Sequence, residues 1–153
     1  SRMRYMIIVR ATAMSEAGVF PDDPGLMAGM AAFHEDLAKA GVLLDARTPD
    51  RFRGESEPID RVAGRIPGST NLPIGDLLNT DGTFRSPEEI RRVAAVAGVH
   101  RDTPVGTTCG SGVTAAQLAL ALHTAGIDAI PYVGSWSEWI EDPNRPIATG
   151  PTV

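Results

Sequence analysis

Short apolar segments rich in β-branched residues alternate along the chain with segments in which apolar residues recur at helical spacing. The first kind predicts strands at residues 5–11, 42–46, 103–108 and 128–134. The second kind predicts helices at residues 24–40, 87–98 and 113–126. Strands that alternate with helices in this way favour an α/β fold, in which a mainly parallel central sheet is covered by helices on both faces.

The first predicted helix carries a clear start signal. Asp23 is its expected N-cap and Pro24 its first residue, while Lys39 falls in its last turn. His34 has charged neighbours, so we expect it on the surface. The buried face of this helix is expected to be apolar and to consist of Leu26, Met30, Phe33 and Leu37.

The middle of the chain contains a polar stretch rich in arginine, glycine and proline, from Arg47 to Asn71. We expect a long loop there, with Arg65 on its surface, and long ordered loops often carry functional sites. The helix that follows opens with a capping box made by Ser86 and Glu89. The next strand has a weak signal, because Gly106 and two threonines are unfavourable in a central strand.

The bulk composition limits what the protein can be. With 153 residues the chain is long enough for one domain. A net charge of −5 argues against nucleic acid or an anionic membrane as a partner. Apolar runs such as residues 6–9 are far shorter than the roughly 20 residues of a membrane span, and we expect no signal peptide. One cysteine excludes an intrachain disulfide and a multi-cysteine zinc site, and it favours the cytoplasm; we expect no metal and no cofactor.

That cysteine, Cys109, lies in the stretch TTCGSGVTAA between a predicted strand and a predicted helix. A lone cysteine is commonly a small buried hydrophobic residue. Here, however, Gly110 and Gly112 allow the backbone to turn tightly, so that successive N–H groups can point at the sulfur. The helix N-terminus adds a partial positive charge. These conditions favour a thiolate, and we therefore predict that Cys109 is a nucleophile.

Two hydroxyl groups lie in the same loop. Ser111 can either cap the helix or hydrogen-bond to the sulfur or a leaving group, and Thr114 can serve as a cap alone. A cysteine phosphatase is a weak alternative, because its loop ends in an arginine where this chain has Ala115. Ligands of α/β folds collect at the carboxyl ends of the strands, which is where Cys109 falls.

The loop strongly resembles the active-site loop of the rhodanese family, and above all of the catalytic C-terminal domain of thiosulfate and 3-mercaptopyruvate sulfurtransferases. The resemblance covers about residues 43–150. It rests on four motifs in the family's order: LLDARTPDRFRGE, GRIPGSTNLP, CGSGVTA, and GSWSEW followed by DPNRPIATG.

The resemblance implies a reaction. Cys109 would attack the sulfane sulfur of a donor, become a persulfide, and pass the sulfur to a thiophilic acceptor such as cyanide or a thiol. The backbone N–H groups of the loop would hold the persulfide. The residues implied are Gly110, Ser111, Gly112, Val113, Thr114 and Ala115.

The same resemblance suggests how the donor is bound. The neutral CGSGVT loop is similar to the mercaptopyruvate type, and Arg51 matches a family arginine that holds the donor's anionic end. Arg61 is a weaker candidate for a second such arginine, because its register differs by one. The remaining matches are expected to be structural: Asp45, Arg47, Trp136 and Trp139.

The first part of the chain departs from that family. Residues 3–44 resemble the start of a YciI-like (DGPF-type) domain, whose members are small ferredoxin-like dimers. We expect one rhodanese-like domain over residues 1–153, in which residues 1–44 complete the sheet and residues 45–153 form the catalytic core. The chain would then be a natural fusion or an engineered chimera.

Three functions remain open from the sequence. The first is a sulfurtransferase that acts on small-molecule donors and acceptors. The second is a catalytically weak or inactive rhodanese fold that serves as a binding or scaffold domain. The third is a homodimer formed through the YciI-like segment.

Overall fold

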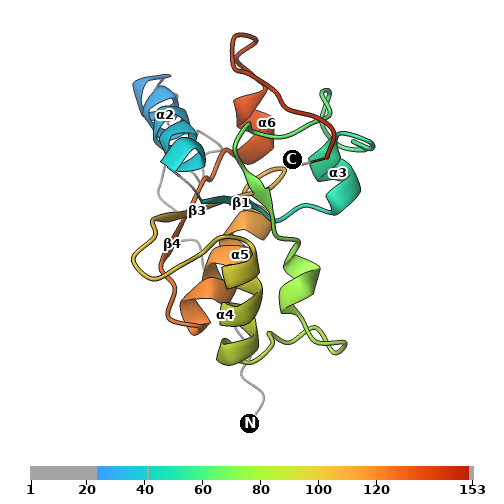
Figure 1. Cartoon of the computed structure of the whole chain (residues 1–153). Helices are drawn as coiled ribbons and strands as arrows, with labels where there is room; N and C mark the ends of the chain where they lie inside the picture. The colour runs from blue at the N-terminus through green and yellow to red at the C-terminus, as the bar shows by residue number, and fades with distance from the viewer. Residues whose placement is uncertain (1–23, 41, 152–153) are drawn as a thin grey trace, which may run out of the picture.

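Four strands form one sheet at the centre of the computed structural model, which describes residues 24–40 and 42–151 (Figure 1). The strands are β1 (Leu43–Asp45), β2 (Thr70–Asn71), β3 (Val105–Thr108) and β4 (Ala129–Pro131). Their order in the sheet is β2-β1-β3-β4, and every pairing is parallel. The predicted α/β fold with a parallel central sheet is therefore confirmed, while the strand predicted at residues 5–11 and the cap Asp23 lie outside the described residues.

Helices cover both faces of this sheet. They are α2 (Pro24–Ala40), α3 (Pro49–Arg53), the 3-10 helix η1 (Ile74–Leu77), α4 (Pro87–Val96), α5 (Val113–Thr124) and α6 (Ser135–Trp139). In Figure 1, α4 and α5 lie on one side of the strands and α2 and α6 on the other. Adjacent residues of β1 point to opposite faces: Leu44 joins the cluster under α4 and α5, whereas Leu43 joins the cluster of Tyr132, Trp136 and Trp139.

Local signals in the sequence set several helix ends. The Ser86 hydroxyl accepts the N–H of Glu89, and the Glu89 carboxylate accepts the N–H of Ser86, which is the predicted capping box. Pro24 begins α2 as predicted. Trp136 and Trp139 are fully buried, which confirms their predicted packing role.

The predicted loop from Arg47 to Asn71 is in part wrong, because α3 and β2 lie within it. Thr48 precedes α3 in an extended conformation, Pro49 occupies its first turn, and Gly54 ends it at φ 74°. The helix buries Phe52. These five residues place Arg51 and Arg53 on a defined surface instead of a free loop.

The prediction that His34 lies on the surface is also wrong. Its side chain is buried, and its ring stacks on the ring of Tyr132 with a centroid distance of 4.5 Å. Phe33, by contrast, is 44% exposed. The described buried face of α2 therefore consists of His34, Leu37 and Ala38, which is the predicted face turned by about one residue.

Arg65 was expected on the surface, and this is wrong as well. Only 6% of the residue is exposed, and its guanidinium donates to the carbonyl oxygen of Gly150 at 2.7 Å. The same group lies over the ring of Phe52 at 4.6 Å from its centroid. Arg65 thus ties the C-terminal part of the chain to α3.

Gly106 has a structural reason to be in β3. A methyl group at this position would lie 2.8 Å from Leu37 Cδ1 and 3.4 Å from His34 Cδ2. The absence of a side chain lets α2 lie directly against the central strand. The residue that weakens the strand signal in the sequence is the residue that allows helix and sheet to pack.

We expect Gly106→Ala to destabilise the protein by about 1–3 kcal/mol, because the methyl group overpacks the contact with α2. Urea unfolding followed by tryptophan fluorescence measures this. Gly29→Ala is the matched control in α2, where an added methyl group meets nothing within 4 Å. That control should be neutral or stabilising, since alanine favours helices. An unchanged unfolding midpoint for Gly106→Ala would contradict the close packing.

Candidate active site

Cys109 directly follows the central strand β3, at its carboxyl end. The side chain is buried, with 2% of the residue exposed. The backbone N–H of Gly112 donates to the Cys109 sulfur, with 3.1 Å between nitrogen and Sγ. An N–H that points at sulfur stabilises negative charge on that atom, which is what a nucleophilic thiolate needs.

The turn that makes this contact depends on Gly112. Its φ is 87°, a left-handed conformation that side chains rarely adopt. A Cβ atom there would also collide with the carbonyl oxygen of Val133 and lie 3.0 Å from its carbonyl carbon. Gly112 is the N-cap of α5 and no side chain caps this helix, so the predicted capping role of Ser111 or Thr114 is wrong.

The predicted loop residues are buried to different degrees. Ala115 is fully buried, Gly110 and Thr114 are partly exposed, and Ser111 is exposed. Val113 is 75% exposed although it is apolar. Gly112 supplies the backbone contact to Sγ, and the first turn of α5 follows directly behind it.

The corner between β4 and α6 also holds the loop, through serines for which the sequence alone predicts no role. The Ser135 hydroxyl accepts the N–H of Cys109 at 3.1 Å and donates to the carbonyl oxygen of Tyr132 at 2.7 Å. Ser135 Oγ lies 3.9 Å from Sγ. The GSWSEW motif contained this signal, but only the fold shows that it meets the cysteine.

Two backbone N–H groups of α6 fasten the same loop. Those of Trp136 and Ser137 donate to the carbonyl oxygens of Cys109 and Gly110, at 3.0 and 2.9 Å. These two bonds hold the carbonyl groups of Cys109 and Gly110 toward α6. The loop geometry thus depends on contacts about 26 residues away in the sequence.

Arg51 lies beside this loop. A Cβ atom added to Gly110 would lie 3.3 Å from the Nη2 atom of Arg51. The guanidinium donates to both carboxylate oxygens of Glu57, at 2.6 and 3.2 Å. Burial acts to raise the pKa of Glu57, but the hydrogen bonds from Arg51 and from two backbone N–H groups outweigh it and lower that pKa. The fold therefore places Arg51 beside Gly110, the residue that follows Cys109.

The second arginine candidate is placed differently. Arg61 donates to the carbonyl oxygen of Ile140 at 2.6 Å and to Glu141 at 3.1 Å. Both contacts lie at the end of α6, and none of its described contacts is with residues 109–115. Arg61 therefore has no described part in the site around Cys109.

Asp45 and Arg47 form a buried ion pair behind the site, with 2.7 Å between Nη2 and Oδ2. Arg47 also donates to the carbonyl oxygen of Gly64 at 2.8 Å, and it lies over the ring of Trp136. These contacts agree with the structural role expected from the sequence. They fix the end of β1 next to the end of β3.

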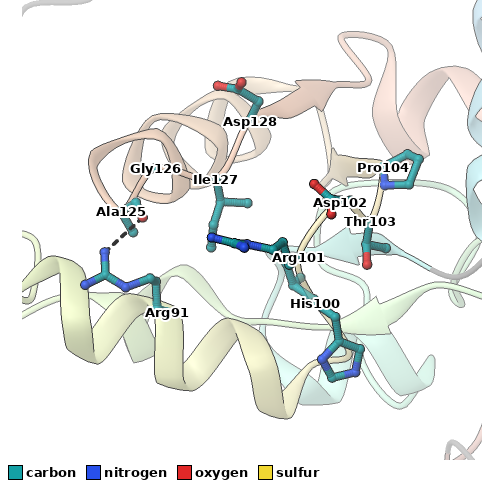
Figure 2. A pocket seen from close by; sticks show the side chains of 11 residues that line it. Arg91, His100, Arg101, Asp102, Thr103, Pro104, Ala125, Gly126, Ile127 and Asp128 are labelled. Atoms are coloured by element: carbon teal, nitrogen blue, oxygen red, sulfur yellow. Dashed lines mark hydrogen bonds between the residues drawn. The ribbon is translucent and has the colours of Figure 1, made fainter.

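A separate pocket of about 730 Å³ lies at the other end of β3. Pro104 precedes that strand whereas Cys109 follows it, so the pocket and Cys109 lie at opposite ends of β3. Figure 2 shows side chains of both charges around the pocket, and Arg91 donating to the carbonyl oxygen of Ala125 at 3.1 Å. No predicted site residue lines it.

In residues 24–40 and 42–151, no cluster of three or more His, Cys, Asp or Glu side chains is arranged to hold a metal ion. Within those same limits, no helix is both long and apolar enough to cross a membrane.

The loop, its arginine and the parallel sheet define a class of protein. The family model described as "Rhodanese-like domain" matches residues 30–142, and the chain belongs to this family. Residues 43–150, on which the resemblance was based, largely coincide with the matched region.

Named relatives agree with this assignment. The chain is 46% identical over 134 residues to "Probable 3-mercaptopyruvate sulfurtransferase" of Pseudomonas aeruginosa, covering 84% of this chain and 46% of that protein. It is 45% identical over 100 residues to human 3-mercaptopyruvate sulfurtransferase, covering 63% of this chain and 34% of the relative. The crystal structure of Tum1 from Saccharomyces cerevisiae matches with a TM-score of 0.68 and 32% identity, over 80% of this chain and 44% of that one. The chain thus spans less than half the length of these relatives.

Proposed function

We propose that the protein is a sulfurtransferase that moves a sulfane sulfur from thiosulfate or 3-mercaptopyruvate to a thiophilic acceptor through a persulfide on Cys109. The observation that carries this proposal is the hydrogen bond from the Gly112 N–H to the Cys109 sulfur, at 3.1 Å, in a loop at the carboxyl end of the central strand. Such a group stabilises negative charge on sulfur before and after the transfer.

With thiosulfate as donor, the Cys109 thiolate attacks the outer sulfur. The new bond joins Sγ to that sulfur, the S–S bond of thiosulfate breaks, and sulfite leaves with the bonding electron pair. Cys109 is then a persulfide that carries the negative charge on its terminal sulfur. We propose that this sulfur lies in a cradle formed by the loop residues that follow Cys109, which are Gly110, Ser111, Gly112, Val113, Thr114 and Ala115.

With 3-mercaptopyruvate, the thiolate attacks the thiol sulfur and the C–S bond breaks. The electron pair passes to the carbon as the enolate of pyruvate, which takes up a proton, and the thiol proton is released to solvent or to the acceptor. In the second half-reaction cyanide attacks the terminal sulfur, thiocyanate forms, and the thiolate of Cys109 returns. This is covalent catalysis with two separate half-reactions.

The sulfurtransferase names of the relatives support an enzyme over an inactive scaffold. A single free cysteine suits a reducing compartment, and we place the reaction in the cytoplasm.

The test follows the sulfur atom directly. The protein is incubated with thiosulfate or 3-mercaptopyruvate, and its intact mass is measured before and after cyanide is added. We expect Cys109 to gain the mass of one sulfur atom with the donor, and to lose it with cyanide as thiocyanate forms. A folded protein that gains no sulfur from either donor would refute the proposed function.

Arg51 is proposed to bind the donor's anionic group. Within the described residues, its Nη1 group donates to no protein acceptor, so that group is free to receive an anion beside Gly110. We expect Arg51→Ala to lower kcat/KM by about 10- to 100-fold, the value of one charge-assisted hydrogen bond.

Arg53→Ala is the matched control for that variant. Arg53 lies on the same short helix and pairs with exposed Glu55 at 2.8 Å. It should leave kcat/KM unchanged, and both variants should unfold at nearly the wild-type temperature. An Arg51→Ala protein that is folded and fully active would contradict the donor-binding role.

We also propose that residues 1–44 and 45–153 form one domain. Support comes from α2, whose side chains Leu37 and His34 approach Gly106 of β3 closely. The YciI resemblance, the fusion or chimera origin and the homodimer stay predictions, because much of that segment lies outside the described residues. Size-exclusion chromatography with light scattering tests the dimer, and a strict monomer would contradict it.

A further inference from the structure

Next to the Cys109 loop lies a carboxylate that the proposed reaction does not use. Asp60 is nine-tenths buried, with 9% of its side chain exposed. Its Oδ2 atom is 3.6 Å from Arg51 Nη2, and it has no hydrogen-bond partner among the described residues. A buried carboxylate oxygen without a donor is unusual and favours a functional explanation.

Asp60 is connected to the loop through one hydroxyl group. Ser137 Oγ lies 2.7 Å from Asp60 Oδ1 and 2.9 Å from the carbonyl oxygen of Gly110. The single hydroxyl proton of Ser137 is therefore shared between a carboxylate and the residue after the cysteine. Asp60 is thus held beside the place where Arg51 would meet a donor.

The formal charges around Arg51 do not cancel. Asp45, Arg47, Glu57, Arg51 and Asp60 form a continuous series of ion pairs. Three carboxylates face two guanidinium groups in this series, and a further guanidinium group, that of Arg65, acts on Asp45 at the far end of the series from Asp60. At the near end, Glu57 and Asp60 both face the guanidinium group of Arg51. Glu57 already takes both Nε and Nη2 of Arg51, which leaves Asp60 as the carboxylate that is not neutralised by a hydrogen bond from arginine.

We infer that Asp60 is a specificity-determining residue that selects donors with a single negative charge over donors with two. This inference rests on the proposed function, since it concerns the donor of that same site. At neutral pH, thiosulfate carries two negative charges, whereas 3-mercaptopyruvate carries one on its carboxylate and keeps its thiol largely protonated. Each negative charge on the donor is repelled at short range by the carboxylate of Asp60. Because this part of the site is partly buried, salt screens the repulsion only weakly.

The experiment compares the two donors in two proteins. Asp60→Asn removes the charge and keeps an oxygen that can accept from Ser137. The rate of Cys109 persulfide formation is measured at limiting concentrations of each donor. We expect the thiosulfate to 3-mercaptopyruvate rate ratio to rise about tenfold in Asp60→Asn, as one removed charge a few ångströms away predicts.

Glu55→Gln is the control for a change of net charge. Glu55 is 56% exposed and pairs with Arg53, not with Arg51, so its neutralisation should leave the ratio unchanged. Asp60→Ala is a second variant, in case asparagine disturbs the fold, and it should shift the ratio in the same direction. A ratio that stays the same in both Asp60 variants, or that rises equally in Glu55→Gln, overturns the inference.

Binding without turnover separates this inference from the proposed function. Sulfate and pyruvate serve as a dianionic and a monoanionic probe, and tryptophan fluorescence follows their binding. The inference expects Asp60→Asn to gain affinity for sulfate by about tenfold more than for pyruvate. If that shift is found while no persulfide forms with either donor, the sulfurtransferase proposal fails and charge selection stands. If neither probe binds to either protein, charge selection itself is wrong.

Discussion

Cys109→Ser is expected to reduce thiocyanate formation to the uncatalysed background, with both donors. A serine hydroxyl is a poor nucleophile toward sulfur and cannot carry a persulfide, so neither half-reaction remains. The fold should survive, because the Gly112 N–H can donate to an oxygen in place of Sγ. The cyanide assay and a urea unfolding curve measure these two properties on the same preparation.

The wild-type protein provides its own control for that variant. Cys109 is the one cysteine of the chain, so alkylation with iodoacetamide modifies no other thiol. The alkylated protein should be as inactive as Cys109→Ser. Turnover that persists in the serine variant would show that another group carries the sulfur.

Gly112→Ala is expected to have the largest effect on stability. The new methyl group collides with the carbonyl oxygen of Val133, and a left-handed φ of 87° is itself unfavourable for alanine. Together these terms are expected to cost about 2–5 kcal/mol. The protein that still folds should form persulfide much more slowly, because the N–H that points at the sulfur is displaced.

Gly126→Ala separates the effect of the collision with Val133 from the effect of the left-handed backbone conformation. Gly126 has a similar φ of 75°, yet a methyl group there meets nothing within 4 Å. Its substitution should cost only the conformational term, about 1 kcal/mol, and should leave the persulfide rate unchanged. Equal urea midpoints for the two variants would mean that the contact with Val133 does not constrain the loop.

Much of the fold was predictable because its signals are local. The capping box of Ser86 and Glu89 and the glycine pair around Ser111 act over a few residues, so they can be recognised without the rest of the chain. α3 was missed for the opposite reason, since five residues are too few to show a helical period. The Thr48-Pro49 start was visible, but the polar surroundings favoured a loop.

The burial of His34 and Arg65 could not be predicted, because its causes lie far away in the sequence. His34 is covered by Tyr132, and Arg65 donates to the carbonyl oxygen of Gly150. The two partners lie 98 and 85 residues away in the sequence, and charged neighbours of His34 such as Glu35 and Asp36 favour a surface position. A polar residue is buried when a partner is available, and only the fold provides that partner.

In the candidate site, too, some residues could be recognised from the sequence and others only from the fold. Cys109, Gly112 and Arg51 could be selected from motifs. Ser135, Ser137 and Asp60 could not, because their relevance comes from where the end of α6 and the segment after α3 meet the loop. The conclusion is that the reactive atom was visible in the sequence, whereas the groups that orient its loop were not.

The contacts between α6 and the loop give the chemistry at sulfur a spectroscopic readout. The amide protons of Trp136 and Ser137 are bound to the carbonyl oxygens of Cys109 and Gly110, so their chemical shifts and their exchange with deuterium depend on the state of that loop. When sulfur is added to or removed from Cys109, these two backbone amides are placed to register the change. The protein therefore carries, in its own backbone, two NMR probes of whether its cysteine is loaded.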